Sequence, residues 1–273
     1  MPVVIAPSIA RALCVACTSV VLGLRLIPWP APADAAEPPT PSPPATTVSA
    51  EDELSPDYQS ENGSSNQVNL RAQLPYDDAR WLVRIKLPIV TAAPSQSVTG
   101  AGDLALWDLA VFNSGRGQWL AGPTLRIPTA KDSLGTNKYS LGPAAGYVVS
   151  DRGWTLGFFG QSFFSIIGPS SYPPVGKTQI DPVVKLGLQR GWSVGFSTMQ
   201  FTYDWVRNRW TDVPLGLRVG KSAIGELKSL DAYMEGERNL ARAPDTPGWT
   251  VRALVRWTFS GLQNAASDAA DDR

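Results

Sequence analysis

The sequence contains no histidine. Histidine is the usual general base of hydrolytic and acyl-transfer sites, so enzymes that depend on it are excluded. Cysteine is scarce as well, because Cys14 and Cys17 both lie within the first 35 residues. Without histidine, and with cysteine confined to that segment, a zinc site of the usual kind is also excluded. We therefore expect no catalytic residues, no metal ion and no cofactor.

The chain also carries no net charge. The 24 Lys and Arg residues balance the 24 Asp and Glu residues, so the composition favours neither a nucleic acid nor an acidic partner. A phosphate-binding loop is also missing, because neither Gly135-Thr136 nor Gly220-Lys221 belongs to a G-x-x-x-x-G-K-[ST] motif.

The apolar run at residues 13–24 is too short to cross a bilayer as a helix, which takes about 20 residues. Arg11 precedes the run, and Ala33-Asp34-Ala35 follows it with the spacing of a cleavage site. We predict a secretory signal peptide over residues 1–35 that directs export through the inner membrane. Cleavage there would leave a mature chain without cysteine, and hence without disulfides.

Residues 36–66 are rich in Pro, Ser, Thr, Glu and Asp and contain little to bury. This composition predicts a disordered linker or tail. We expect the folded domain to span residues 67–260, and residues 261–273 to form a flexible C-terminal tail.

From Gln67 onward, apolar and polar residues alternate with a period of two, which is typical of strands with one buried face. The 24 Gly and 24 Pro residues favour turns over helices. Strand-like runs cover residues 67–74, 81–89, 102–113, 117–128, 138–150, 153–167, 178–190, 192–205, 211–222, 227–239 and 249–259. The run 192–205 changes face between Phe196 and Met199, which predicts a bulge. The sequence therefore predicts an all-β fold.

The connections between these runs alternate in length. Tight turns are expected at residues 113–116, 151–153, 190–191 and 223–226, and longer polar loops at 91–101, 129–137, 168–177, 206–210 and 240–248. Transmembrane β-barrels show this alternation, and aromatic residues near the ends of the runs match their interfacial girdles. We therefore predict an antiparallel up-and-down β-barrel in the outer membrane of a Gram-negative bacterium, in contact with the lipid bilayer.

The pattern allows two numbers of strands. The runs number eleven, whereas bacterial single-chain barrels have even numbers of strands. Either the run 67–74 lies outside the wall, leaving ten strands, or a poorly patterned strand precedes it and gives twelve. We favour twelve.

The last run has one fully apolar face that ends in aromatic residues: Trp249, Val251, Ala253, Val255, Trp257 and Phe259. It resembles the terminal strand by which the barrel-assembly machinery recognises outer-membrane barrels, and that machinery is an expected partner. Taken alone, the stretch would equally suit a half-buried strand of a soluble sandwich.

Several further segments resemble the outer-membrane proteins of the meta-pathway of phenol degradation. They are residues 81–90 (WLVRIKLPIV), 102–108 (GDLALWD), 122–129 (GPTLRIPT), 134–136 (LGT) with 138–143 (KYSLGP), and 213–221 (VPLGLRVGK). The likeness covers roughly residues 74–259 in matching order, and the chain departs from it at the Pro/Ser-rich N-terminal stretch. The resemblance implies a barrel through which small molecules pass.

If the apolar faces point to lipid, the opposite faces line the lumen. The charged residues expected there are Arg71, Arg84, Lys86, Asp108, Arg126, Asp181, Lys185, Arg218, Asp231, Glu235, Glu237, Arg252 and Arg256. Closure places the last strand beside the first, so Arg252 and Arg256 would approach Arg71. In a ten-stranded barrel they would approach Arg84 and Lys86 instead.

The acids Asp231, Glu235 and Glu237 lie on the strand before the last. One hypothesis is a basic wall faced by acids, whose transverse field selects solutes by charge and dipole. The alternative is a ladder of cross-strand ion pairs that stiffens a filled barrel. Four apolar residues are further candidates for the lumen and would suit a partly apolar or aromatic solute: Leu104, Leu106, Phe159 and Phe163.

These patterns favour a channel or transporter for small solutes. One alternative is a closed structural or interaction barrel without transport. A second is an outer-membrane enzyme that uses a carboxylate pair on the strand containing Asp231 and Glu235.

Overall fold

The computed structural model describes residues 43–58, 63–93, 99–131, 134–224, 229–241, 243 and 246–259. The predicted signal peptide, both cysteines and the predicted C-terminal tail lie outside these residues. Among the described residues, no helix is long and apolar enough to cross a membrane.

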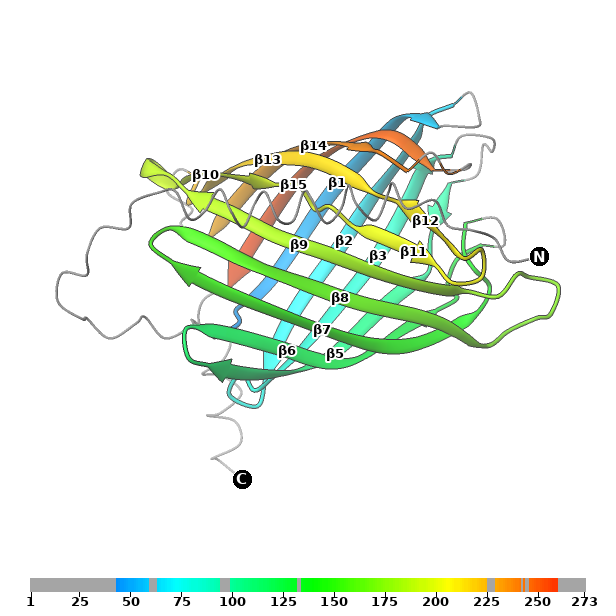
Figure 1. Ribbon diagram of the computed structural model, residues 1–273, viewed down its shortest axis with the longest axis horizontal. Coiled ribbons are helices and arrows are strands. Elements are labelled where there is room, and N and C mark those ends of the chain that lie inside the picture. The colour runs from blue at the N-terminus through cyan, green and yellow to red at the C-terminus, as the bar shows by residue number, and fades with distance from the viewer. Residues whose placement is uncertain are drawn as a thin grey trace, which may run out of the picture. The chain divides into compact units, whose positions relative to one another are not determined.

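The described chain forms one antiparallel sheet that closes on itself (Figure 1). Its strands are β1 (Thr46–Tyr58), β2 (Ser65–Tyr76), β3 (Trp81–Ala92), β4 (Gly100–Ala101), β5 (Leu104–Ser114), β6 (Gly117–Ile127), β7 (Tyr139–Asp151), β8 (Trp154–Ile167), β9 (Gly176–Gly187), β10 (Trp192–Phe196), β11 (Phe201–Asp204), β12 (Arg209–Asp212), β13 (Pro214–Ser222), β14 (Leu230–Asn239) and β15 (Pro247–Phe259). A single 3₁₀ turn, η1 (Gln189–Gly191), is the helical element of this region. Closure pairs β1 and β15 with each other, so the first and last strands present no free edge, which is what a sheet surrounded by lipid requires.

The wall has twelve strands. Of the fifteen segments, β4 continues into β5, β10 into β11 and β12 into β13, and fifteen less three gives twelve. The ring closes where β15 pairs with β1, and where β9 pairs with both β10 and β11. The prediction of a twelve-stranded up-and-down barrel is confirmed.

The prediction of a disordered linker over residues 36–66 is wrong at Thr46–Tyr58, which forms the first wall strand, β1. This strand pairs with β15 from Thr46↔Phe259 onward and with β2 from Thr47↔Gln73 onward. Its composition looks disordered because its lumen face is polar, while its outer face carries few large apolar residues. Tertiary pairing on both sides supplies what local propensity does not.

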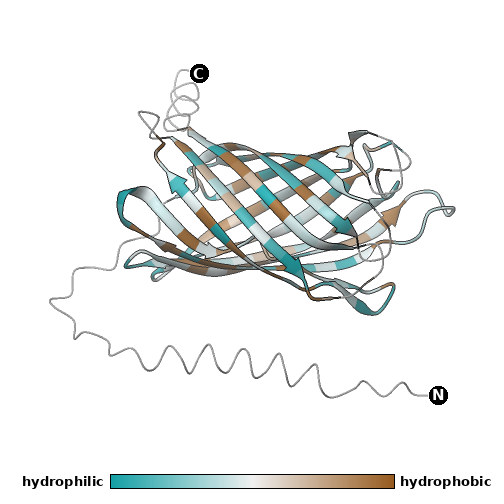
Figure 2. Ribbon diagram, turned by 90° about the horizontal axis from the view of Figure 1, so that it is seen from above, coloured by the Kyte–Doolittle hydropathy of each residue, from teal (hydrophilic) through white to brown (hydrophobic). Residues whose placement is uncertain are grey.

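The outer face of the barrel is apolar. Along the strands, hydrophobic and hydrophilic residues alternate (Figure 2). On β15, Trp249, Val251, Val255, Trp257 and Phe259 are all exposed. Such a face is stable in lipid and not in water.

Aromatic side chains gather at both ends of the outer face. Trp81, Trp119, Trp154, Trp192 and Trp257 lie near the end with the tight turns, and all are exposed. Contacts between them and their neighbours include Trp119 with Tyr147, whose ring centroids are 4.7 Å apart. Near the other end, exposed aromatics are Tyr139, Trp205, Trp210 and Trp249. These are the girdles that the sequence predicted.

The connections that the structure describes in full follow the predicted alternation with one exception. The tight turn predicted at residues 223–226 and the loops predicted at 91–101, 129–137 and 240–248 lie partly outside the described residues. The tight turns place residues at positive φ, such as Gly115 (φ 57°), Arg152 (φ 48°) and Gly153 (φ 85°). The predicted longer loop at residues 206–210 is instead a tight turn between β11 and β12. It is tight because Asn208 adopts a φ of 50° and the Asp204 carboxylate accepts a hydrogen bond from the Arg207 backbone N–H at 2.9 Å.

The predicted change of face in residues 192–205 is confirmed as an interruption between β10 and β11. The backbone N–H of Ser197 donates to Gly216 at 3.2 Å, and that of Met199 donates to Ser197 at 2.7 Å. This local fold brings Thr198 and Gln200 to the lumen, where both line a cavity.

Part of the lumen is filled with apolar side chains. Leu82, Leu109, Leu120 and Ala144 form a buried cluster. They come from the four neighbouring strands β3, β5, β6 and β7, toward the end with the tight turns. The lumen is therefore narrowed on this side, and the polar space lies elsewhere.

Ala253 lies at the middle of the outer face of β15, so Ala253→Arg is expected to lower the free energy of unfolding by about 2–4 kcal/mol in lipid vesicles. The reason is that the guanidinium would enter hydrocarbon. Urea titration of vesicle-inserted protein measures the change, with Ala253→Leu as the control that keeps the face apolar. Equal stability of the two variants would contradict a lipid-facing β15.

Candidate functional site

The structure places all but one of the predicted lumen residues on the inner face. They are Arg71, Arg84, Lys86, Arg126, Asp181, Lys185, Arg218, Asp231, Glu235, Glu237, Arg252 and Arg256. The face was predictable because each of these residues alternates with apolar neighbours along its strand.

Asp108 is the exception. It lies opposite Val83 on the outer face, where the exposed Tyr76 hydroxyl donates to its carboxylate at 2.8 Å. The prediction that Leu104 and Leu106 face inward is also wrong, because they share the outer face of β5 with Asp108. Phe159 and Phe163 do line the lumen. Both faces of β5 are largely apolar, so alternation alone did not reveal which face is inside.

Arg252 is the centre of an ion-pair network on the inner face. Its guanidinium lies 2.7 Å from the Glu237 carboxylate, 3.1 Å from that of Glu53 and 3.8 Å from that of Glu235. The Arg252 side chain is only 11% exposed. A buried charge of this kind requires its partners, because removal of one partner leaves uncompensated charge.

Further ion pairs extend the network to the neighbouring strands. They are Arg218–Glu235 at 2.5 Å, Arg256–Asp231 at 2.6 Å and the bidentate pair Arg71–Glu51 at 2.7 and 2.8 Å. Charge therefore alternates strand by strand: β13 is basic, β14 acidic, β15 basic, β1 acidic and β2 basic. Cross-strand neighbours of opposite sign stabilise each other in such an arrangement.

The expectation that the last strand lies beside that of Arg71 is wrong. The strand β1 lies between β15 and β2, so Ser49 separates Arg256 from Arg71. Glu53 pairs with Arg252, and Glu51 pairs with Arg71. Sequence reasoning missed both acids because they lie in the stretch assigned to the linker. On this half of the wall, the ladder of ion pairs describes the structure better than a basic wall faced by acids.

The strands that follow β2 around the wall carry cations of a different kind. Within the described part of the chain, Arg84, Lys86 and Arg126 form no ion pair. Two of them lie over aromatic rings instead: Arg126 is 4.2 Å from the ring centre of Phe163, and Arg84 is 5.1 Å from that of Phe159. These contacts hold the guanidinium groups without neutralising them.

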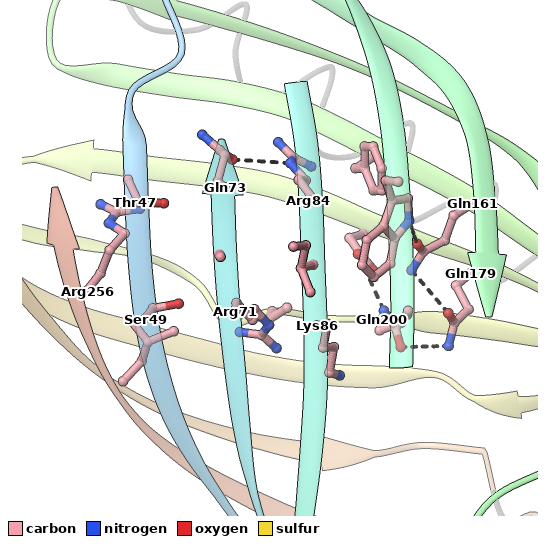
Figure 3. Close-up of a pocket in the computed structure, with 18 of the residues that line it drawn as sticks. Thr47, Ser49, Arg71, Gln73, Arg84, Lys86, Gln161, Gln179, Gln200 and Arg256 are labelled. Carbon is pink, nitrogen blue, oxygen red and sulfur yellow. Dashed lines mark hydrogen bonds between the residues drawn. The ribbon is translucent and has the colours of Figure 1, made fainter. Parts of the chain in front are cut away.

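A cavity of about 460 Å³ lies in the lumen and is lined by residues of both groups of strands (Figure 3). Its charged lining residues are Arg71, Arg84, Lys86, Arg126, Arg218, Arg256 and Asp181. Six are cationic and one is acidic. Arg71, Arg218 and Arg256 are paired with acids that lie outside this lining. The net positive charge of the cavity therefore comes from Arg84, Lys86 and Arg126.

A chain of glutamine side chains crosses one side of this cavity (Figure 3). The Trp107 indole N–H donates to Gln161 at 2.6 Å, Gln161 donates to Gln179 at 3.1 Å, and Gln179 donates to Gln200 at 2.7 Å. At the end of this series of hydrogen bonds, the Gln200 amide N–H donates to the Asp181 carboxylate at 3.5 Å. Sequence reasoning missed these residues, since a neutral amide on a strand carries no signal beyond the polar face that it occupies.

A second cavity, of about 210 Å³, lies closer to the end with the longer loops. Its charged lining residues are Glu53, Lys177, Asp212, Glu237 and Arg252. Gln179 and Gln200 line both cavities. The glutamine chain is thus the junction between a mixed-charge outer cavity and a basic inner one. In the described ranges, no group of three or more His, Cys, Asp or Glu side chains is arranged to hold a metal ion.

No protein-family model matches the chain, and no curated protein matches it. Among solved structures, the chain is similar to the COG4313 outer membrane channel from Pseudomonas putida F1, with a TM-score of 0.56 and 17% identity over 84% of this chain and 100% of that chain. The shared fold is a closed antiparallel β-barrel.

Two further alignments have lower TM-scores and add nothing to the argument for the fold. A bacterial polysaccharide outer membrane secretin aligns with a TM-score of 0.35 and 13% identity, over 79% of this chain and 98% of that chain. A mutant porin of Rh. blastica aligns with a TM-score of 0.28 and 10% identity, over 79% of this chain and 99% of that chain.

Replacement of Arg252 by Gln is expected to lower the free energy of unfolding by about 3–5 kcal/mol, because Glu53, Glu235 and Glu237 would lose their shared buried partner. Chemical unfolding of the purified barrel measures this loss. The control is Arg256→Gln, which breaks the more exposed pair with Asp231 and should cost only about 0–1 kcal/mol. A similar small cost at both positions would show that Arg252 is not the centre of the network.

Proposed function

We propose that the chain is a channel of the bacterial outer membrane through which small solutes pass. The observation that carries this proposal is the pair of polar cavities inside the closed wall, which share the lining residues Gln179 and Gln200. The cavities follow one another from the end with the longer loops toward the centre of the barrel. A solute that crosses the membrane would traverse both of them.

The location has independent support. An apolar outer face with aromatic girdles suits a lipid bilayer, and the similar structure from Pseudomonas putida F1 is an outer membrane channel. The segments resembling proteins of the meta-pathway of phenol degradation favour the same class. We further propose export by the N-terminal signal and insertion by the barrel-assembly machinery, which would recognise the apolar, aromatic-ended face of β15.

An enzyme is the less supported alternative. The three carboxylates on β14 that sequence reasoning singled out, Asp231, Glu235 and Glu237, each form an ion pair with an arginine. Carboxylates held in this way neutralise the wall, whereas a glycosidase pair must act on a substrate as acid and nucleophile or base.

A closed structural barrel is favoured by one specific observation, the partial filling of the lumen. The apolar cluster around Leu109 and the hydrogen-bonded glutamines both narrow the route. Passage therefore depends on the junction at Gln179 and Gln200, where the side chains must part or leave room for a solute.

Single-channel recording in planar bilayers tests the proposal, using the protein extracted from the envelope of cells that express the full chain. Discrete conductance steps are expected. They should become larger in the double variant Gln179→Ala with Gln200→Ala, because removal of the two amides widens the junction. The control is Gln189→Ala in the exposed turn η1, which should leave the steps unchanged. A folded wild-type barrel and double variant that both fail to conduct would establish the closed barrel instead.

A further inference from the structure

We infer that the larger cavity is a binding site for a small carboxylate with a flat, apolar body. The inference rests on the proposed function only for the route by which the solute reaches the site. The combination that points to it is a set of cations without acidic partners, set directly against phenylalanine rings in the lumen.

The charge of the cavity requires an anion. On the β3 and β6 wall, Arg84, Lys86 and Arg126 form no ion pair among the described residues. The single acid that faces them is Asp181. Guanidinium groups bind carboxylates through paired, charge-assisted hydrogen bonds, and Lys86 adds a further donor. A bound anion would supply the negative charge that carboxylates provide in the ion-pair ladder from β13 to β2.

The apolar surface of the cavity selects the body of that anion. Phe159 and Phe163 stand on the same face of β8, and Trp107 approaches Phe163 edge-on with ring centroids 6.4 Å apart. Arg84 and Arg126 lie over the two phenylalanine rings, so the charged group and the flat apolar surface are presented side by side. A solute with a carboxylate on a planar ring matches both features, because its ring can stack on the guanidinium planes or against the aromatic edges.

The size and the polar rim of the cavity limit the solute further. A volume of about 460 Å³ falls at the small end of ligand pockets and suits a compound with one ring. The amides of Gln73, Gln161, Gln179 and Gln200 line the cavity and supply neutral donors and acceptors. One oxygen of Asp181 is buried without a hydrogen-bond partner among the described residues. The Asp181 carboxylate repels an anion. Its removal therefore tests whether the site prefers negative charge.

Isothermal titration calorimetry of the detergent-solubilised barrel with benzoate, inorganic phosphate and benzyl alcohol tests the inference. Benzoate is expected to bind more tightly than either of the others, because phosphate lacks the ring and benzyl alcohol lacks the charge. Equal binding of phosphate and benzoate would overturn the apolar part of the inference. Equal binding of benzyl alcohol and benzoate would overturn the anionic part.

Three variants locate the site. Arg84→Gln with Lys86→Gln should weaken benzoate binding roughly tenfold or more, since two charge-assisted donors are lost. Asp181→Asn should strengthen it. Arg116→Gln, in an exposed turn, removes a positive charge outside the lumen and should change nothing. A loss of binding in Arg116→Gln equal to that in the double variant would overturn the assignment to this cavity.

Benzoate binding and conductance test the site and the channel separately. Heat-modifiable migration on gels shows first that each variant is folded. Benzoate binding by a barrel that never conducts would sustain the site and refute the channel. Conductance without benzoate binding would sustain the channel and refute the site.

Discussion

Closure of the sheet by β1 is the constraint on which the rest of the structure depends. In lipid an unpaired strand edge leaves backbone N–H and C=O groups without partners, and each such group costs several kcal/mol. The strand β1 removes both edges by pairing with β15 and β2. The same strand carries Glu51 and Glu53, which neutralise Arg71 and Arg252. Wall and charge balance therefore form together, from the segment whose composition least resembles a strand.

The lumen that results is divided in its electrostatics. From β13 to β2, acids and bases alternate between neighbouring strands and satisfy one another. On β3 and β6, Arg84 and Arg126 have aromatic or amide neighbours in place of acids, and Lys86 forms no ion pair among the described residues. Desolvated charge without a counter-charge is costly, so a protein that retains it gains from an anion that enters. The ion-paired strands from β13 to β2 are thus stable without a solute. They support the strands β3 and β6, whose cations suit an anionic solute.

The polar face of a strand could be predicted in most of the barrel. The prediction failed where the local pattern was ambiguous. Along β15 every second residue is apolar, and the exposed and inward positions follow that alternation without exception. Along β5, Leu106 and Trp107 are both apolar, so nothing in the pattern showed that Trp107 faces inward and Asp108 outward. The glutamines carry no charge and no motif, and their role as a junction became visible only when β8, β9 and β11 were placed side by side.

The sequence by itself determined the fold class, the approximate strand number and the face of most charged residues. It could do so because strand periodicity is a local property: adjacent side chains point to opposite sides whatever the rest of the chain does. Only the tertiary structure decided which charges neutralise each other. Arg252 and Glu53 are 199 residues apart and meet because the barrel closes, and Lys86 is left without an acid because its neighbouring strands offer none at that level. Ion pairing is set by the register between strands, and the register of β15 against β1 exists only when the ring closes.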